Sequence, residues 1–189
     1  MRLSIKPYIP LLCLSAAFYF TVKEQKDYFY KNSPDQVTQN MYGTHYFTVK
    51  RDLALELPQH ISDKNKPICV FGHEPEIFYY AHLRSASGFL YLYPALESQP
   101  YAQQMADKFI HETEAADPEI LIYLYDTVPS QNPVTSEYLK KWIDNYKKNY
   151  RIIGQVYVEN GSPKIEWQSD TSKVFLPKNP YYALVYRKK

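Results

Sequence analysis

The sequence predicts an α/β fold, a three-layer sandwich around a mixed sheet, and three observations indicate it. Two short, wholly apolar runs, 68–71 and 120–125, are typical of strands buried on both faces of a parallel sheet. Between them, the apolar spacing of 101–116 predicts an amphipathic helix. Asn160-Gly161 is a strong hairpin signal. The alternation favours parallel strands in the middle of the chain, and the hairpin favours an antiparallel C-terminal edge.

Capping residues and periodicity predict the first helices of the domain. Ser33 and Pro34 are the cap and the first position of a short helix, which Gly43 ends. Helically spaced apolar residues predict a further helix over 49–61. Pro58 interrupts that pattern, so the helix is kinked or ends just before it.

Aromatic residues and prolines define the elements around the two apolar runs. Pro75 opens a short helix that continues to Ala81. The segment 89–93 predicts a second, aromatic-rich strand that Pro94 ends. Ser136 caps a second long helix. The remaining strands are expected at 150–158, 164–168 and 181–186.

The N-terminal segment has the composition of a membrane segment. A basic start precedes 16 residues without charge, 7–22. Spanning a bilayer takes about 20 apolar residues, with a lower limit near 17, so a signal peptide and a membrane helix compete. The apolar run continues past its small residues to Val22, which favours the membrane helix. We therefore expect a membrane helix with its juxtamembrane extension over 1–32, and a soluble α/β domain over 33–189.

Composition excludes some classes of protein and leaves others open. The 189 residues are 45% hydrophobic and 16% aromatic, which is enough for a core. A net charge of +2 with dispersed basic residues argues against nucleic-acid binding. Cys13 and Cys69 lie in different environments, so no disulfide is expected and the redox compartment stays undecided.

No motif of the sequence assembles a complete catalytic site. The five glycines form no phosphate-binding loop, so we expect no nucleotide cofactor. The five histidines are scattered, and no cysteine pair has ligand spacing, so no metal site is expected. Each histidine is interpreted as a surface or loop side chain. A nucleophile elbow is also missing, and we assign no catalytic residue.

The most informative polar residues follow the first apolar run. In open α/β sheets, ligands bind outside the carboxyl ends of the parallel strands. Glu74 and Glu76 could act as an acid and a base there, or they could cap and favour the start of the following helix. Arg84 could clamp a carboxylate or phosphate, or it could pair with one of the two glutamates.

Aromatic residues accompany these charges at the expected strand ends. Tyr80 and Tyr101 could stack on sugar rings, or they could pack between layers. A third expected strand end begins at Asp126. We therefore predict a ligand- or partner-binding face made of Glu74, Glu76, Tyr80, Arg84 and Tyr101.

Several blocks of this stretch carry a resemblance to a known family. They read GHEPEIFYY, RSA, YLYP and ESQPYA, at 72–80, 84–86, 91–94 and 97–102. The segments YKNSP, at 30–34, and Tyr42-Gly43 add to it. Together they resemble the C-terminal soluble domain of bacterial multi-pass glycosyltransferases. These enzymes belong to the dolichyl-phosphate-mannose protein mannosyltransferase-like group, which uses lipid-linked sugar donors.

The resemblance implies an accessory domain, held on the extracytoplasmic side of the bacterial inner membrane. Its expected partners are the membrane, a multi-pass glycosyltransferase, and a glycan or lipid-linked sugar. Enzymes of this group carry their catalytic acids among many membrane helices, and this chain has at most one such helix, so transferase activity does not follow. Two alternatives stay open. One is a stand-alone hydrolase that uses Glu74 or Glu76, and the other is a structural membrane-associated protein.

Overall fold

The computed structural model describes most of the chain as two compact units, Met1–His45 and Tyr46–Lys189. The described residues are 8–42, 46–125, 131–160, 162–169, 175–178 and 181–189.

The described part of the first unit, 8–42, contains three α-helices. They are α1 (Ile9–Glu24), α2 (Lys26–Tyr30) and α3 (Pro34–Tyr42). The start of α3 confirms the predicted cap, because the Ser33 amide donates to Gln36 Oε1 and the Gln36 amide donates to Ser33 Oγ, at 2.8 and 3.3 Å. None of the residues of α1 is buried.

The membrane helix stays a prediction. Among the described residues, no helix combines the length and the apolar content that crossing a bilayer requires.

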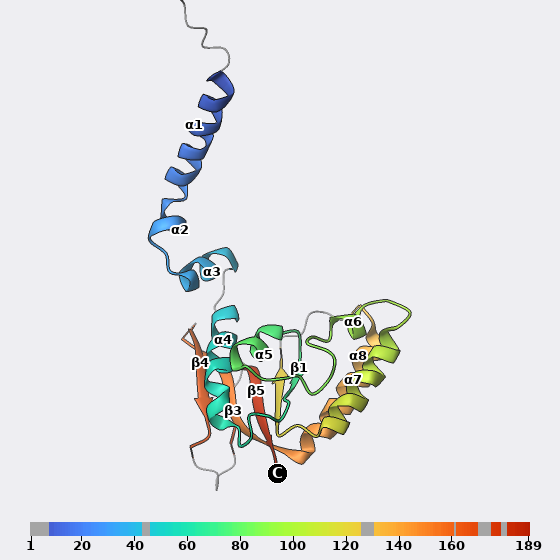
Figure 1. The fold of residues 1–189 in the computed structure, drawn as a ribbon. Helices are drawn as coiled ribbons and strands as arrows, with labels where there is room; N and C mark the ends of the chain where they lie inside the picture. The colour runs from blue at the N-terminus through green and yellow to red at the C-terminus, as the bar shows by residue number, and fades with distance from the viewer. Residues whose placement is uncertain (1–7, 43–45, 126–130, 161, 170–174, 179–180) are drawn as a thin grey trace, which may run out of the picture. The chain divides into compact units, whose positions relative to one another are not determined.

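The second unit is built on a mixed sheet of five strands among the described residues. They are β1 (Cys69–Phe71), β2 (Ile120–Leu124), β3 (Tyr150–Glu159), β4 (Ser162–Trp167) and β5 (Tyr181–Lys188). Their order across the sheet is β1-β2-β5-β3-β4 (Figure 1). Among these five strands only β1 and β2 run parallel, with Val70 opposite Ile122, and the other strand pairs are antiparallel. The mixed sheet with an antiparallel C-terminal part is thereby confirmed.

The pairing of β3 with β4 confirms the predicted hairpin. Glu159 pairs with Ser162, and Asn160 has a φ of 52°. Asparagine tolerates this left-handed conformation better than most residues, which suits a tight hairpin.

Helices cover both faces of the sheet. One face carries α4 (Tyr46–Glu56), the 3₁₀ turn η2 (Leu57–His60) and α5 (Pro75–Ala81). The other face carries α6 (Tyr93–Leu96), α7 (Ala102–Ala116) and α8 (Pro133–Tyr146), which the 3₁₀ turn η3 (Lys147–Asn149) extends. Figure 1 shows α7 and α8 side by side, where the Trp142 indole donates to Glu114 at 2.8 Å.

Side-chain alternation along β1 and β2 divides the core between these two faces. Val70 and Ile122 point to the α4–α5 side, whereas Cys69, Phe71 and Leu121 point to the α7–α8 side. Both groups are buried, so both faces of the parallel strands are covered as the apolar runs predicted.

Of three local predictions, the structure overturns two and confirms one. The segment 89–93 is not a strand, because the Leu92 amide donates to Gly72 O at 3.1 Å and the chain then turns into α6. The cap of α8 is Asn132, whose side chain accepts from the Thr135 amide, rather than Ser136. The helix expected over 49–61 does end before Pro58, which lies in η2.

Candidate functional site

The turn after β1 is shaped by a close approach between two strand ends. A Cβ atom added at Gly72 would lie 2.3 Å from Leu124 Cδ1 and 2.9 Å from Leu124 Cβ. Only glycine fits so near the end of β2 without displacing it. The chain therefore passes directly from β1 to Glu74 and Pro75, which begin α5.

A buried ion pair lies at the start of α5. The Lys50 ammonium contacts Glu74 Oε1, and the two side chains are only 3% and 9% exposed. Lys50 comes from α4, so the pair joins α4 to the start of α5. A buried charge is tolerated only when it is paired, and here each charge provides the counter-charge of the other.

Glu76 is the second carboxyl group of the site. It lies in the first turn of α5, and its Oε1 atom is buried without a hydrogen-bond partner. Burial, and after it a hydrogen bond to Glu74, raise the pKa of Glu76 to about 7. The single positive charge of Lys50 is already matched by Glu74, so the neutral form of Glu76 is favoured.

His73 completes the polar part of the site. Both of its ring nitrogens are buried and make no hydrogen bond in the described structure. Its ring centroid lies 4.8 Å from that of Tyr93. Burial lowers the pKa of His73, although Glu74 opposes the shift, so the imidazole is favoured in its neutral form. We call Lys50, His73, Glu74, Glu76 and Tyr93 the carboxyl-end cluster.

The structure brings together some of the predicted site residues and separates others. Glu74 and Glu76 are neighbours in the carboxyl-end cluster. Arg84 is exposed and its guanidinium donates to Asn65 O at 2.9 Å, while its own carbonyl accepts from the Ile68 amide. Arg84 therefore lies at the other end of β1 and forms no pair with either glutamate.

The two predicted tyrosines lie on the surface. Tyr80 is partly exposed on α5, with its ring edge-on to the ring of Tyr79 at 5.1 Å. Tyr101 is exposed and immediately precedes α7. The expected strand end at Asp126 lies outside the described residues.

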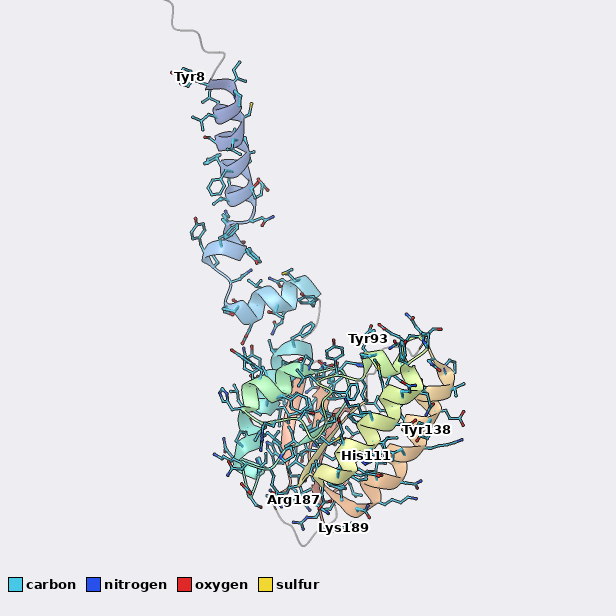
Figure 2. The ribbon with its side chains drawn as sticks, turned by 45° about the vertical axis from the view of Figure 1, so that its right-hand side comes forward. Tyr8, Tyr93, His111, Tyr138, Arg187 and Lys189 are labelled. Atoms are coloured by element: carbon cyan, nitrogen blue, oxygen red, sulfur yellow. The ribbon has the colours of Figure 1, made fainter. Side chains whose placement is uncertain are left out.

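Exposed aromatic side chains surround the carboxyl ends of the parallel strands. Tyr91 and Tyr93 flank Leu92, which is hydrogen-bonded to Gly72, and Tyr125 directly follows β2. Their side chains are 47%, 37% and 64% exposed, so their rings are accessible to a partner. Figure 2 shows Tyr93 at the edge of the folded body where α6 begins.

The cluster has the groups for proton exchange and for polar recognition. A neutral carboxyl group with a pKa near 7 can donate a proton or a hydrogen bond at physiological pH. The neutral imidazole of His73 supplies one donor and one acceptor. Among the described residues, no three His, Cys, Asp or Glu side chains come together as metal ligands.

Sequence reasoning missed Lys50 and His73. A signal for Lys50 was present, because Lys50, Leu53, Ala54 and Leu57 have the spacing of one helix face and three of them are apolar. A lysine on an apolar face requires a buried counter-charge. For His73 the sequence held no comparable signal, since the contact with Tyr93 is tertiary.

Comparisons of the chain with protein-family models, with curated proteins and with solved structures found no match.

Proposed function

We propose that this chain is a membrane-associated, extracytoplasmic α/β domain, accessory to a glycosyltransferase system that uses lipid-linked sugars. One observation carries the proposal. The segments that resemble the C-terminal domain of such enzymes, 72–80 and 91–94, are joined by the hydrogen bond from Leu92 to Gly72 and by the contact between the His73 and Tyr93 rings. The two blocks therefore meet in the interior, and the exposed rings of Tyr91 and Tyr93 beside that contact suit a recognition face.

The first helix supports attachment to a membrane. Large apolar side chains project from all sides of α1, since Leu12, Phe18 and Phe20 lie on different faces of the helix and are 60%, 71% and 58% exposed. A helix that is apolar all round requires apolar surroundings. Attachment to the bacterial inner membrane, with the α/β unit on the extracytoplasmic side, would provide them.

The chemistry of the carboxyl-end cluster supports a glycan or a transferase surface as its partner. Sugar rings offer an apolar C–H face to tyrosine rings such as Tyr91 and Tyr93, and their hydroxyl groups hydrogen-bond to carboxyl groups such as Glu76. The domain would then position a glycan or hold the transferase, while the chemistry takes place in the partner.

Site-specific photo-crosslinking in bacterial cells tests this proposal. A benzophenone amino acid at Tyr93 is expected to capture a multi-pass membrane protein or a lipid-linked sugar, identified by mass spectrometry. Tyr138 on α8 is the matched control, since it is 40% exposed against 37% for Tyr93 (Figure 2). Capture of the same partners from both positions, or of no membrane component from Tyr93, would contradict the proposal.

A second candidate function is a stand-alone hydrolase that uses Glu76 as its acid. The pKa of Glu76 near 7, caused mainly by burial, favours this candidate. A purified chain that hydrolyses glycosides, and loses at least about 100-fold in rate on Glu76→Gln, would establish it. Equal rates for the chain and its Glu76→Gln variant would rule it out.

A further inference from the structure

A concave site lies at the opposite end of the sheet from the carboxyl-end cluster. It is an open pocket of about 540 Å³ between the end of α8 and the end of β5. Figure 2 shows Tyr93 and Lys189 at opposite ends of the folded body. The residues of the pocket that carry the argument are Asp117, Tyr146, Lys148, Tyr150, Lys188 and Lys189.

The walls of this pocket are fixed by the sheet and by hydrogen bonds that close its sides. Lys188 pairs with Tyr150 across β3 and β5, and its amide donates to Glu119 O at 2.9 Å. The Lys189 amide donates to Asn149 O at 3.1 Å. The buried Tyr150 hydroxyl donates to Pro118 O at 2.8 Å. The lysines are therefore presented by ordered backbone.

The side chains of the pocket carry an excess of positive charge. Three of them are lysines and only Asp117 is acidic, and Asp117 pairs with Lys188. The Lys148 ammonium donates to the Asn145 side chain at 2.9 Å, and the Lys189 ammonium donates to the Lys148 carbonyl at 2.8 Å. Both of these acceptors are neutral, so two ammonium groups have no counter-charge among the side chains of the pocket.

The two tyrosines add acceptors beside these cations. The single hydroxyl proton of Tyr150 goes to the Pro118 carbonyl, since a carbonyl cannot donate. The Tyr146 hydroxyl, 3.2 Å from that of Tyr150, must therefore donate to it, and its own oxygen remains free to accept. A ligand that suits the pocket combines an anionic group with hydroxyl donors.

From these contacts we infer that the pocket binds a phosphate ester that carries hydroxyl groups. The phosphate would lie between the Lys148 and Lys189 ammonium groups, and a hydroxyl group would donate to Tyr146. The volume exceeds that of a bare phosphate ion and lies within the usual range of small-molecule sites. Such a ligand is available both as a soluble metabolite and as a lipid headgroup, which share this chemistry. The inference is independent of the function proposed for the carboxyl-end cluster.

Isothermal titration of the full chain in an uncharged detergent tests the inference, with glycerol 3-phosphate as the soluble probe. The chain is expected to bind it, and Lys148→Gln/Lys189→Gln is expected to weaken binding by at least about tenfold. Lys140→Gln/Lys141→Gln removes the same charge from exposed positions of α8 outside the pocket, and it should leave affinity unchanged. All three proteins are first compared by thermal unfolding.

A second arm distinguishes the sources of the phosphate. Flotation with phosphatidylcholine vesicles, with and without phosphatidylglycerol, measures the contribution of an anionic headgroup. If binding depends on the pocket lysines in either arm, the inference is supported. The arm that shows this dependence identifies the source of the phosphate. Equal losses in the two double variants in both arms, or no binding of either probe, would overturn it.

Discussion

The Lys50 ammonium and the Glu74 carboxylate form an ion pair that joins α4 to α5, with both side chains almost wholly shielded from solvent. The pair accounts for a lysine on the apolar face of α4 and for a glutamate at the start of α5. Burial is the main cause of the raised pKa of Glu76, and the pair adds to it, because Glu76 lies beside a positive charge that Glu74 already neutralises.

Removal of one partner of this pair should destabilise the domain strongly. Lys50→Met leaves Glu74 buried without a counter-charge, so we expect a loss of about 3–5 kcal/mol in the free energy of unfolding. The double variant Lys50→Met/Glu74→Leu should recover most of that loss, because no buried charge remains. Urea unfolding measures both values, and a double variant no more stable than Lys50→Met would contradict the assignment.

The stability of the domain should depend on the proton of Glu76. The pKa of Glu76 is raised from 4.5 to about 7 in the folded chain, so the folded state binds more protons than the unfolded state over that interval. This contribution is fully present below pH 4.5 and is lost as the pH rises through 7.

Glu76→Gln should remove this dependence, because glutamine is neutral at every pH. Relative to the unmodified chain, the variant should gain about 1–2 kcal/mol between pH 4.5 and 8, since one pKa unit is worth about 1.4 kcal/mol and solvent screens a half-buried group. Urea unfolding across this range gives the difference. Parallel stability curves would show that Glu76 titrates normally.

Gly72→Ala should displace the end of β2. The new methyl group would collide with the Leu124 side chain, so we expect a loss of about 1–3 kcal/mol in the free energy of unfolding. Gly88→Ala is the control, because a Cβ there would meet only the Glu112 carboxylate, at 3.4 Å. Thermal or urea unfolding compares the two, and equal losses would refute the steric argument.

Asn132, rather than Ser136, should control the start of α8. Asn132→Ala removes the side-chain oxygen that accepts from the Thr135 amide, and it should cost about 1 kcal/mol. Ser136→Ala lies inside the helix and should cost less. The reverse order of the two losses in urea unfolding would restore Ser136 as the cap.

Periodicity in the sequence correctly predicted the helices and strands that pack on a broad apolar face. The helix expected over 101–116 is α7, and the two apolar runs are β1 and β2. The strand predicted at 89–93 was wrong, because aromatic residues favour strands only where a partner strand exists. Here Leu92 is buried against the end of β1, while Leu90 and Tyr91 are about half exposed.

The sequence predicted only part of the candidate site. Glu74 and Glu76 lie two positions apart in the chain and directly follow an apolar strand, so their position was predictable. Lys50 and Tyr93 approach the cluster from other elements. Arg84 lies at the other end of β1, because the chain after α5 returns to the start of that strand. Such contacts depend on how the helices pack, which local pattern does not encode.

The order of the strands also has a consequence for folding. β1 and β2 form one ladder, β3 and β4 form another, and β5 connects the two. Since β5 is the last of these strands in the sequence, the inner edges of both ladders stay unpaired until Tyr181–Lys188 docks between them. Until then the exposed edges are open to wrong pairing, so a chaperone that covers strand edges would have its greatest effect in that interval.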